Sequence, residues 1–457
     1  MEEHMTRKQE NQFWDRLRGV TEDAGADPQT LEIFDEAVSR RRFMGRMGVG
    51  GAALTLFGFG AGTDAAMRGL FGRGLIPAAW ADEANGLEDE QAKSAMSDAS
   101  KEDGLIVHND RPLNVETPPH LLEDEVTPAS RHFIRNNDLI PQQALDRDPN
   151  GWSLKIDGEV HDELEIGLDD LKSMDSKDLV LHIECGGNGR ANFDPQPRGN
   201  PWNRGAVGNA KWTGVPLKDI LERAGVKDSA VYTAHEGYEP ILGDRGPFSR
   251  GVPIDKAMEE HTIVAYAMNG EDIPATHGFP VRLVVPGWYG SCSHKWLNKI
   301  TLRDQEHDGR GMTGYSYRMP KYPVAPGERP PEEDMKVGGP WLIKSVITGP
   351  KKDTGLERGE TVKVTGHAWA GEDEVAEVWI STDFGLNWEK ADLKGDPVNK
   401  YAWVHFEKEL SFENRGYYEI WARAVDDKGN TQPIVQPWNP RGYDGNIVHK
   451  IPVTVAA

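Results

Sequence analysis

The sequence predicts an α+β domain followed by a β-sandwich of immunoglobulin-like size. The 457 residues suffice for about two or three domains of ordinary length. With 50 glycines, 30 prolines and 14 tryptophans, the composition is typical of a globular, turn-rich protein. Mixed helix and strand patterns occupy residues 105–335, and alternating strand patterns occupy residues 336–457. We therefore expect two folded domains with a boundary near Met335.

Residues 1–81 are expected to be a polar extension followed by a twin-arginine export signal. The motif SRRRFM at 39–44 precedes an uncharged run at 47–63 and the small-residue pattern AWA at 79–81. A transmembrane anchor is the alternative, but 17 residues with six glycines are fewer than the roughly 20 strongly apolar residues of a spanning helix. We expect cleavage after Ala81 and a periplasmic protein with no membrane span in its mature form.

The predicted first domain begins after a tether. Residues 82–104 are acidic and lack aromatic side chains, so they are expected to be flexible. Residues 179–184 (LVLHIE) predict a strand, and apolar side chains recur at helical spacing over 217–224. The proline-rich stretch 315–333 marks the edge of this domain, because proline removes backbone donors and fixes extended conformations.

The predicted second domain consists of strands. Residues 361–369, 375–381 and 416–425 alternate apolar and polar side chains with the two-residue period of a strand. Turns rich in glycine, aspartate and asparagine separate these segments. The pattern predicts a β-sandwich.

Charge and cysteine content exclude several functions. A formal charge of -22 makes nucleic acid an unsuitable partner, since phosphate binding needs a basic surface. The two cysteines, Cys185 and Cys292, are too few for a four-thiolate iron–sulfur cluster, and neither lies in a CxxCH haem-attachment motif. We expect no haem in this chain and no disulfide between the two thiols.

Cys185 directly follows the predicted strand 179–184 and begins the turn CGGNGR at 185–190. A glycine-rich turn lets a ligand approach the backbone closely. Taken alone, a single cysteine is more often an inert packing residue. The turn also lacks the G-x-G-x-x-G spacing of a dinucleotide-binding loop, so a Rossmann domain is excluded.

Six separate blocks resemble the sulfite oxidase family of molybdenum enzymes, in order and in spacing. They are HFIRNN (132–137), HIECGGNGR (182–190), WNRGAVGNAKWTGVPL (202–217), AYAMNGEDIPATHGFPVRLVVPG (265–287), HKWL (294–297) and PWNPRGY (437–443). Within the family, ECGGNGRANF, GSCSHKW and HDGRGMTGYSYRMPKYPVAPG are most similar to SoxC, the catalytic subunit of sulfane dehydrogenase.

The resemblance implies a molybdopterin-binding domain at 105–335 and an immunoglobulin-like β-sandwich dimerisation domain at 336–457. It also implies one molybdenum atom on a molybdopterin, with the thiolate of Cys185 as protein ligand, a role that suits a soft donor. The cofactor residues implied are Phe133, Ile134, Arg135, Asn136, Glu239, His277, Arg282, Ser293, His294 and Lys295. Arg282 and Lys295 can neutralise a phosphate.

The resemblance further implies a substrate pocket formed by Arg135, Arg190, Trp202, Tyr317 and Arg441. Three guanidinium groups would hold an oxyanion even in an acidic chain. Tyr315 is the alternative to Tyr317 as the phenol of the site. The turn departs from animal and plant sulfite oxidases, which carry CAGNRR where this chain has CGGNGR, so one positive charge is missing at Gly189.

The function implied is two-electron oxidation, by oxo transfer, of sulfane sulfur on a carrier protein or of sulfite. Electrons would pass to a c-type cytochrome partner, and the assembly would be a homodimer or a heterotetramer. An S-oxide or N-oxide reductase of the same fold is one alternative. A non-enzymatic exported module built on the β-sandwich is the other.

Overall fold

The computed structural model describes residues 89–98, 100–395 and 399–456. The export signal predicted before residue 82 lies outside this range, as does the first part of the predicted tether. The described residues all belong to one compact unit. No helix in the described part of the chain has the length and apolar character needed to cross a membrane.

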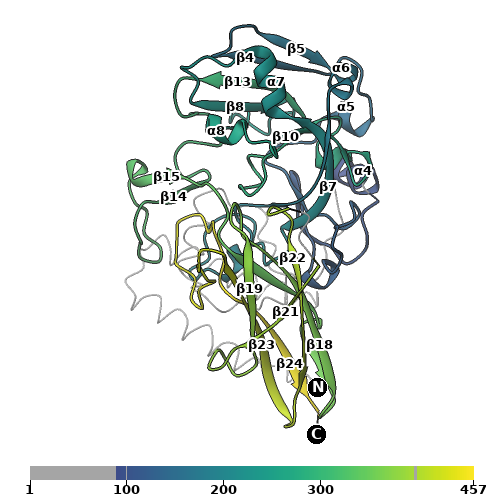
Figure 1. Cartoon of the computed structure of the whole chain (residues 1–457), viewed down its shortest axis with the longest axis vertical. Coiled ribbons are helices and arrows are strands. Elements are labelled where there is room, and N and C mark those ends of the chain that lie inside the picture. Colours follow the sequence, from purple (N-terminus) through teal and green to yellow (C-terminus); the bar gives the residue numbers. More distant parts are fainter. Residues whose placement is uncertain (1–88, 99, 396–398, 457) are drawn as a thin grey trace, which may run out of the picture. The chain divides into compact units, whose positions relative to one another are not determined.

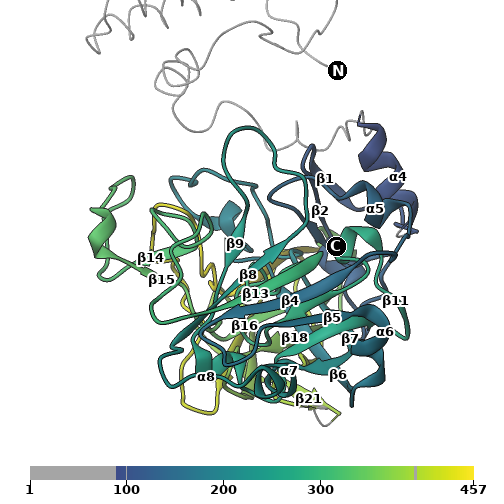
Figure 2. The same ribbon diagram turned by 90° about the horizontal axis from the view of Figure 1, so that it is seen from above.

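Part of the predicted tether is instead a packed helix. Helix α4 (Glu90–Asp98) contacts helix α5 (Gln142–Leu145) and the 3-10 helix η4 (Ala275–His277), and Figure 2 shows α4 beside α5. Ala92 and Ala95 are only 2% and 0% exposed. The prediction of flexibility is wrong here, because two small apolar side chains on one face are enough to pack this short helix closely.

The first domain contains a mixed sheet of order β5-β4-β13-β8-β9, in which β4 and β13 are parallel. Helix α7 (Leu217–Ala224) has the bounds predicted from the sequence, and its four apolar side chains pack on this sheet. Figure 1 shows α7 against β13 and β8. The strands are β4 (Ser153–Gly158), β5 (Leu164–Gly167), β8 (Tyr232–Gly237), β9 (Ser249–Arg250) and β13 (Leu297–Arg303).

A second sheet, of order β11-β10-β7-β6 with β12 paired to β10, presents Cys185. The predicted strand 179–184 is confirmed as part of β6, so Cys185 directly follows the strand end. The strands are β6 (Lys177–Glu184), β7 (Val207–Pro216), β10 (Ile263–Met268), β11 (Glu271–Asp272) and β12 (Arg282–Val284). A small sheet of β1 (Ile106–Asp110), β2 (Leu113–Glu116) and β3 (Ile134–Arg135) lies before them in the chain.

Short helices and one hairpin connect these sheets. The helices are η2 (Pro119–Leu121), α6 (Leu168–Ser173), η3 (Arg190–Asn192), α8 (Ile254–Ala257) and η5 (Glu332–Asp334). Strand β14 (Arg318–Pro320) lies within the proline-rich stretch and pairs antiparallel with β15 (Met335–Val337), which begins just after that stretch. This pairing lies at the expected domain boundary.

The C-terminal strands form two sheets with an apolar core between them, as the sequence predicts. Figure 1 shows these strands running alongside one another, away from β4, β5 and β13. One sheet contains β16 (Lys344–Gly349), β18 (Thr361–Trp369), β22 (Val404–Ser411) and β21 (Asp392–Lys394). The other contains β17 (Thr354–Leu356), β24 (His449–Val455), β23 (Gly416–Asp426), β19 (Val375–Ser381) and β20 (Glu389–Lys390).

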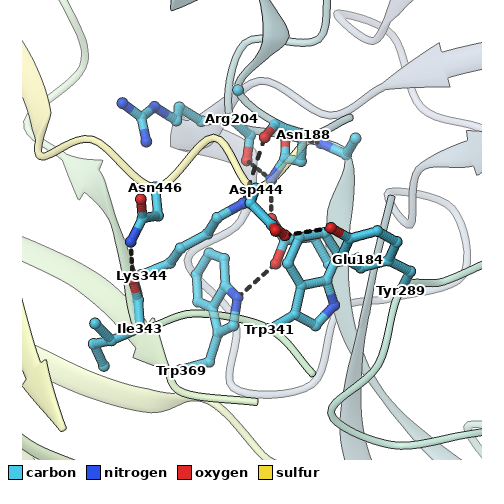
Figure 3. Close-up of polar contacts among 12 residues, drawn as sticks. Glu184, Asn188, Arg204, Tyr289, Trp341, Ile343, Lys344, Trp369, Asp444 and Asn446 are labelled. Carbon is cyan, nitrogen blue, oxygen red and sulfur yellow. Dashed lines mark hydrogen bonds and ion pairs between the residues drawn. The ribbon is translucent and has the colours of Figure 1, made fainter. Parts of the chain in front are cut away.

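A buried polar network joins the sandwich to the strand that precedes Cys185 (Figure 3). Glu184 is fully buried and forms an ion pair with Lys344 of β16. Trp369 Nε1 donates a hydrogen bond of 2.8 Å to Glu184 Oε2, and Asn188 Nδ2 donates one of 2.9 Å to Oε1. Two of these three partners belong to the C-terminal domain, which therefore holds the end of β6 in place.

We expect Lys344→Met to lower the free energy of unfolding by roughly 3–5 kcal/mol, because it leaves the buried Glu184 carboxylate without its cation. Urea unfolding followed by tryptophan fluorescence measures the loss. Lys352→Met is the control, since that side chain is 71% exposed. Equal stability of the two variants would contradict the role of the pair. Adding Glu184→Gln to Lys344→Met should recover part of the loss.

Candidate active site

Two neighbouring cavities meet at Cys185, Arg135 and Tyr317, which line both of them. We call them the inner cavity and the arginine pocket. The inner cavity is also lined by Phe133, Asn136, Glu239, His277, Arg282, Ser293, His294 and Lys295, all of them predicted cofactor residues. The arginine pocket is also lined by Arg190, Arg198, Arg441 and Tyr443. The thiol of Cys185 therefore faces two cavities that are lined by different sets of residues.

The turn after β6 fixes the position of Cys185, which is 6% exposed. Its N–H donates to Ala206 O at 2.9 Å, and its carbonyl accepts from Asn188 N at 2.8 Å. Gly189 has a φ of +91°, and a Cβ there would lie 2.8 Å from Gly445 O in the C-terminal domain. Glycine is therefore required at 189 both by the backbone conformation and by this close approach.

The inner cavity contains cations that donate hydrogen bonds to neutral acceptors. Arg282 donates to the carbonyls of His277 and Ser293, at 2.9 Å each. Lys295 donates to Thr276 O at 2.8 Å and to the side-chain oxygen of Asn136. Burial lowers the pKa of Arg282 to about 9. Burial, together with the nearby guanidinium groups, holds the pKa of Lys295 well below its ordinary value. An anion in this cavity would compensate these buried charges.

Several buried polar atoms of the inner cavity have no hydrogen-bond partner among the described residues. They include Asn136 Nδ2, Glu239 Oε2 and His294 Nδ1. Buried polar groups in folded proteins are nearly always paired, so these donors and acceptors indicate a polar ligand. The cavity therefore offers a carboxylate and amide or imidazole groups for a heterocycle, in addition to cations for an anionic group.

The arginine pocket is built from both domains. Arg190 Nε donates to Arg441 O at 2.8 Å, and Arg190 Nη1 donates to Asn200 O at 2.8 Å. Its guanidinium lies 5.6 Å from the ring centre of Tyr443. Arg441 and Tyr443 come from the C-terminal domain. The cation at Arg190 is thus held in place by backbone carbonyls before any substrate arrives.

Tyr317 forms the wall between the two cavities. Its hydroxyl donates to Asn137 Oδ1 at 3.3 Å, and its ring stacks on Tyr443 with centres 5.4 Å apart. Burial raises the pKa of the Tyr317 phenol, which therefore stays protonated at neutral pH. The alternative, Tyr315, donates its hydroxyl to Pro330 O and lines neither cavity.

Two predicted site residues line neither cavity. Trp202 is fully buried in the apolar cluster that contains Cys185 and Phe133, and it packs edge-to-face on His108, with ring centres 4.6 Å apart. Ile134 is buried in the core beside Val115 and Trp296. Conversely, Arg198, Asn137 and Tyr443 line the cavities and were not predicted. Arg198 and Tyr443 lie close in the sequence to the predicted residues Trp202 and Arg441, and this proximity could have indicated that they belong to the site.

Comparison with known proteins identifies the family. A family model described as an oxidoreductase molybdopterin binding domain matches residues 140–310. A second, described as a Mo-co oxidoreductase dimerisation domain, matches residues 340–456. Mitochondrial sulfite oxidase of Rattus norvegicus is 31% identical over 80% of this chain and 68% of its own length. Sulfite oxidase of Gallus gallus is 32% identical over 81% of this chain and 82% of its own length.

The chain belongs to the sulfite oxidase family. The crystal structure of the sulfane dehydrogenase SoxCD from Paracoccus pantotrophus is also similar, with a TM-score of 0.63 and 27% identity. That match covers 74% of this chain and 84% of the other. Together these findings show a molybdopterin oxidoreductase whose fold is close to that of SoxC.

The inner cavity fits a molybdopterin. The unpartnered Asn136, Glu239 and His294 atoms match the hydrogen-bonding edges of a pterin, and the cations at Arg282 and Lys295 match its phosphate. The thiol of Cys185, where the two cavities meet, is placed to act as the protein ligand of the metal. When bound, the cofactor supplies the two-electron redox chemistry, while the protein supplies position and charge.

We expect Cys185→Ser to abolish turnover with the fold retained, because the remaining inner-cavity residues still bind the pterin. Circular dichroism tests the fold, and pterin fluorescence after extraction tests the cofactor. Cys292→Ser is the control, since the Cys292 thiol is also buried but lines neither cavity. Full activity of Cys185→Ser in loaded protein would contradict its assignment to the metal.

Proposed function

We propose that this protein is an exported dehydrogenase that oxidises an anionic sulfur species, either sulfite or sulfane sulfur borne on a carrier protein. The arginine pocket carries this proposal, since four arginines line it where it meets the thiol of Cys185: Arg135, Arg190, Arg198 and Arg441. The fold similarity to SoxC adds support for sulfane sulfur, and the similarity to sulfite oxidases adds support for sulfite.

The charge of the arginine pocket argues for an anionic substrate. At an effective dielectric constant of about 20, one cation roughly 4 Å from a unit anion contributes on the order of 4 kcal/mol before desolvation. A neutral S-oxide or N-oxide would gain little from several guanidinium groups. The pocket therefore favours oxidation of a sulfur anion over the reductase alternative.

The electron acceptor in this proposal is a c-type cytochrome on a separate chain. The two cysteines of the sequence lie outside any CxxCH motif, so a covalently attached haem must come from a partner. Export by the twin-arginine route, proposed from residues 39–81, would bring the protein to the periplasm. Residues 340–456 match a dimerisation domain, which supports a homodimer or a heterotetramer with the cytochrome.

We expect Arg441→Met to lower kcat/KM for the anionic substrate about 10- to 150-fold, since a hydrogen bond to a charged group contributes about 1.5–3 kcal/mol. The loss should fall mainly on KM. Steady-state kinetics of molybdenum-loaded protein measures it. Arg415→Met, which removes an exposed arginine from the same domain, is the control. An unchanged KM would remove Arg441 from substrate binding.

The substrate is tested by reduction of cytochrome c by protein already shown to contain molybdenum. Rapid sulfite-dependent reduction would identify a sulfite dehydrogenase. If sulfite is inactive, we expect reduction with a carrier protein that bears a cysteine-bound sulfane sulfur. Inactivity with both substrates would overturn the proposal of sulfur oxidation and favour the reductase alternative.

A further inference from the structure

Lys101 is a half-buried lysine, with its amino group turned into the protein, in a segment that the sequence predicts to be a flexible tether. It follows helix α4, where Ser100 has a φ of +47° and Lys101 N donates to Met96 O at 3.0 Å. This turn reverses the chain at the end of the helix, and the Lys101 amino group reaches into the domain. No motif of the family resemblance includes this residue.

The amino group of Lys101 contacts two segments that line the inner cavity. It donates to the carbonyls of Ala129, at 2.6 Å, and His132, and its nitrogen lies 3.1 Å from His277 Nε2. His132 begins the segment 132–137 on one side of the cavity, and His277 ends helix η4 on another. Lys101 therefore links two walls that are distant in the sequence.

The contacts match a charged ammonium. Its three hydrogens meet three acceptors, two carbonyl oxygens and one ring nitrogen, and none of these is a carboxylate. Burial holds the pKa of His277 well below its ordinary value, so the ring is neutral. An ammonium that donates to Nε2 leaves the ring proton on Nδ1, which sets the hydrogen bonds that this ring can offer to a ligand.

Lys101, like Arg282 and Lys295, is a basic group whose pKa is lowered by burial. Its amino group also donates to neutral groups, and burial lowers its pKa to about 7. Its charge contributes to the lowered pKa of both His277 and Lys295. An anion in the inner cavity would favour the charged form of all three basic groups together. An anionic ligand in the inner cavity would therefore also stabilise the charge of Lys101.

We propose that Lys101 is a positioning residue of the molybdopterin site, which holds the segment 132–137 and His277 in the geometry that binds the cofactor. Lys101, which follows helix α4, is then part of the cofactor site. This inference rests on the cofactor assignment and is independent of the identity of the sulfur substrate.

The test is Lys101→Met in the full chain, expressed in a host that makes molybdopterin. We expect the loaded variant to lose pterin and molybdenum at least about tenfold faster than the wild type during incubation, the effect typical of residues that orient ligands of a bound metal or cofactor. Lys93→Met is the matched control, because it removes a lysine from the same segment whose side chain is 47% exposed. Lys93→Met should retain the cofactor as the wild type does.

Melting temperatures separate positioning of the cofactor from a purely structural role. A ligand that binds only the folded state raises the melting temperature. We expect the rise from cofactor-free to loaded protein to be smaller in Lys101→Met than in the wild type. The proposal would be overturned if Lys101→Met lowered the melting temperatures of the cofactor-free and the loaded protein by the same amount. It would also be overturned if the variant retained the cofactor as the wild type does.

If Lys101→Met does not fold, Lys101→Gln replaces it, because the amide can still donate to the carbonyls without a charge. Failure of Lys101→Gln to fold would show a structural role and would also overturn the proposal. Wild-type protein without molybdenum would count against the cofactor assignment itself. Loaded wild-type protein that does not oxidise sulfur compounds would count against the proposed substrate alone.

Discussion

The buried ion pair between Glu184 and Lys344 is the interaction on which the site depends. Placing two charges in the interior of a protein is costly unless every polar atom finds a partner. Here the carboxylate is met by Lys344, Trp369 and Asn188, so its position is fixed from several directions. Because Cys185, which lines both cavities, is the next residue, a contact between two domains determines where its thiol lies.

The net charge of the chain is negative, whereas the side chains of its site are largely cationic. The protein carries a formal charge of -22, whereas both cavities are lined by cations, of which Arg190 and Arg282 are buried. At long range an acidic surface repels anions, so electrostatic steering does not explain binding. For the anionic substrate proposed above, recognition would instead arise at short range, where the Arg190 guanidinium is already held by two backbone carbonyls and needs little reorganisation.

The sequence predicted regular elements better than it predicted the walls of the site. Helix 217–224 and the strands at 361–369 and 375–381 were predicted with their observed bounds, because burial imposes a clear period on their side chains. Helix α4 was missed, since its packing rests on Ala92 and Ala95 rather than on large apolar residues. Trp202 was predicted for the substrate pocket but does not line it, and Arg198 lines the pocket but was not predicted, because a residue's direction within a turn depends on three-dimensional contacts.

The close approach of Gly189 to Gly445 links the evolution of the two domains. A side chain at position 189 would collide with the backbone of the C-terminal domain, so a substitution there requires the loop around residue 445 to change as well. The same loop follows Arg441 and Tyr443 in the chain. Recombination that exchanged only one of the two domains would separate changes that had arisen together, and the family is therefore expected to inherit both domains as a single unit.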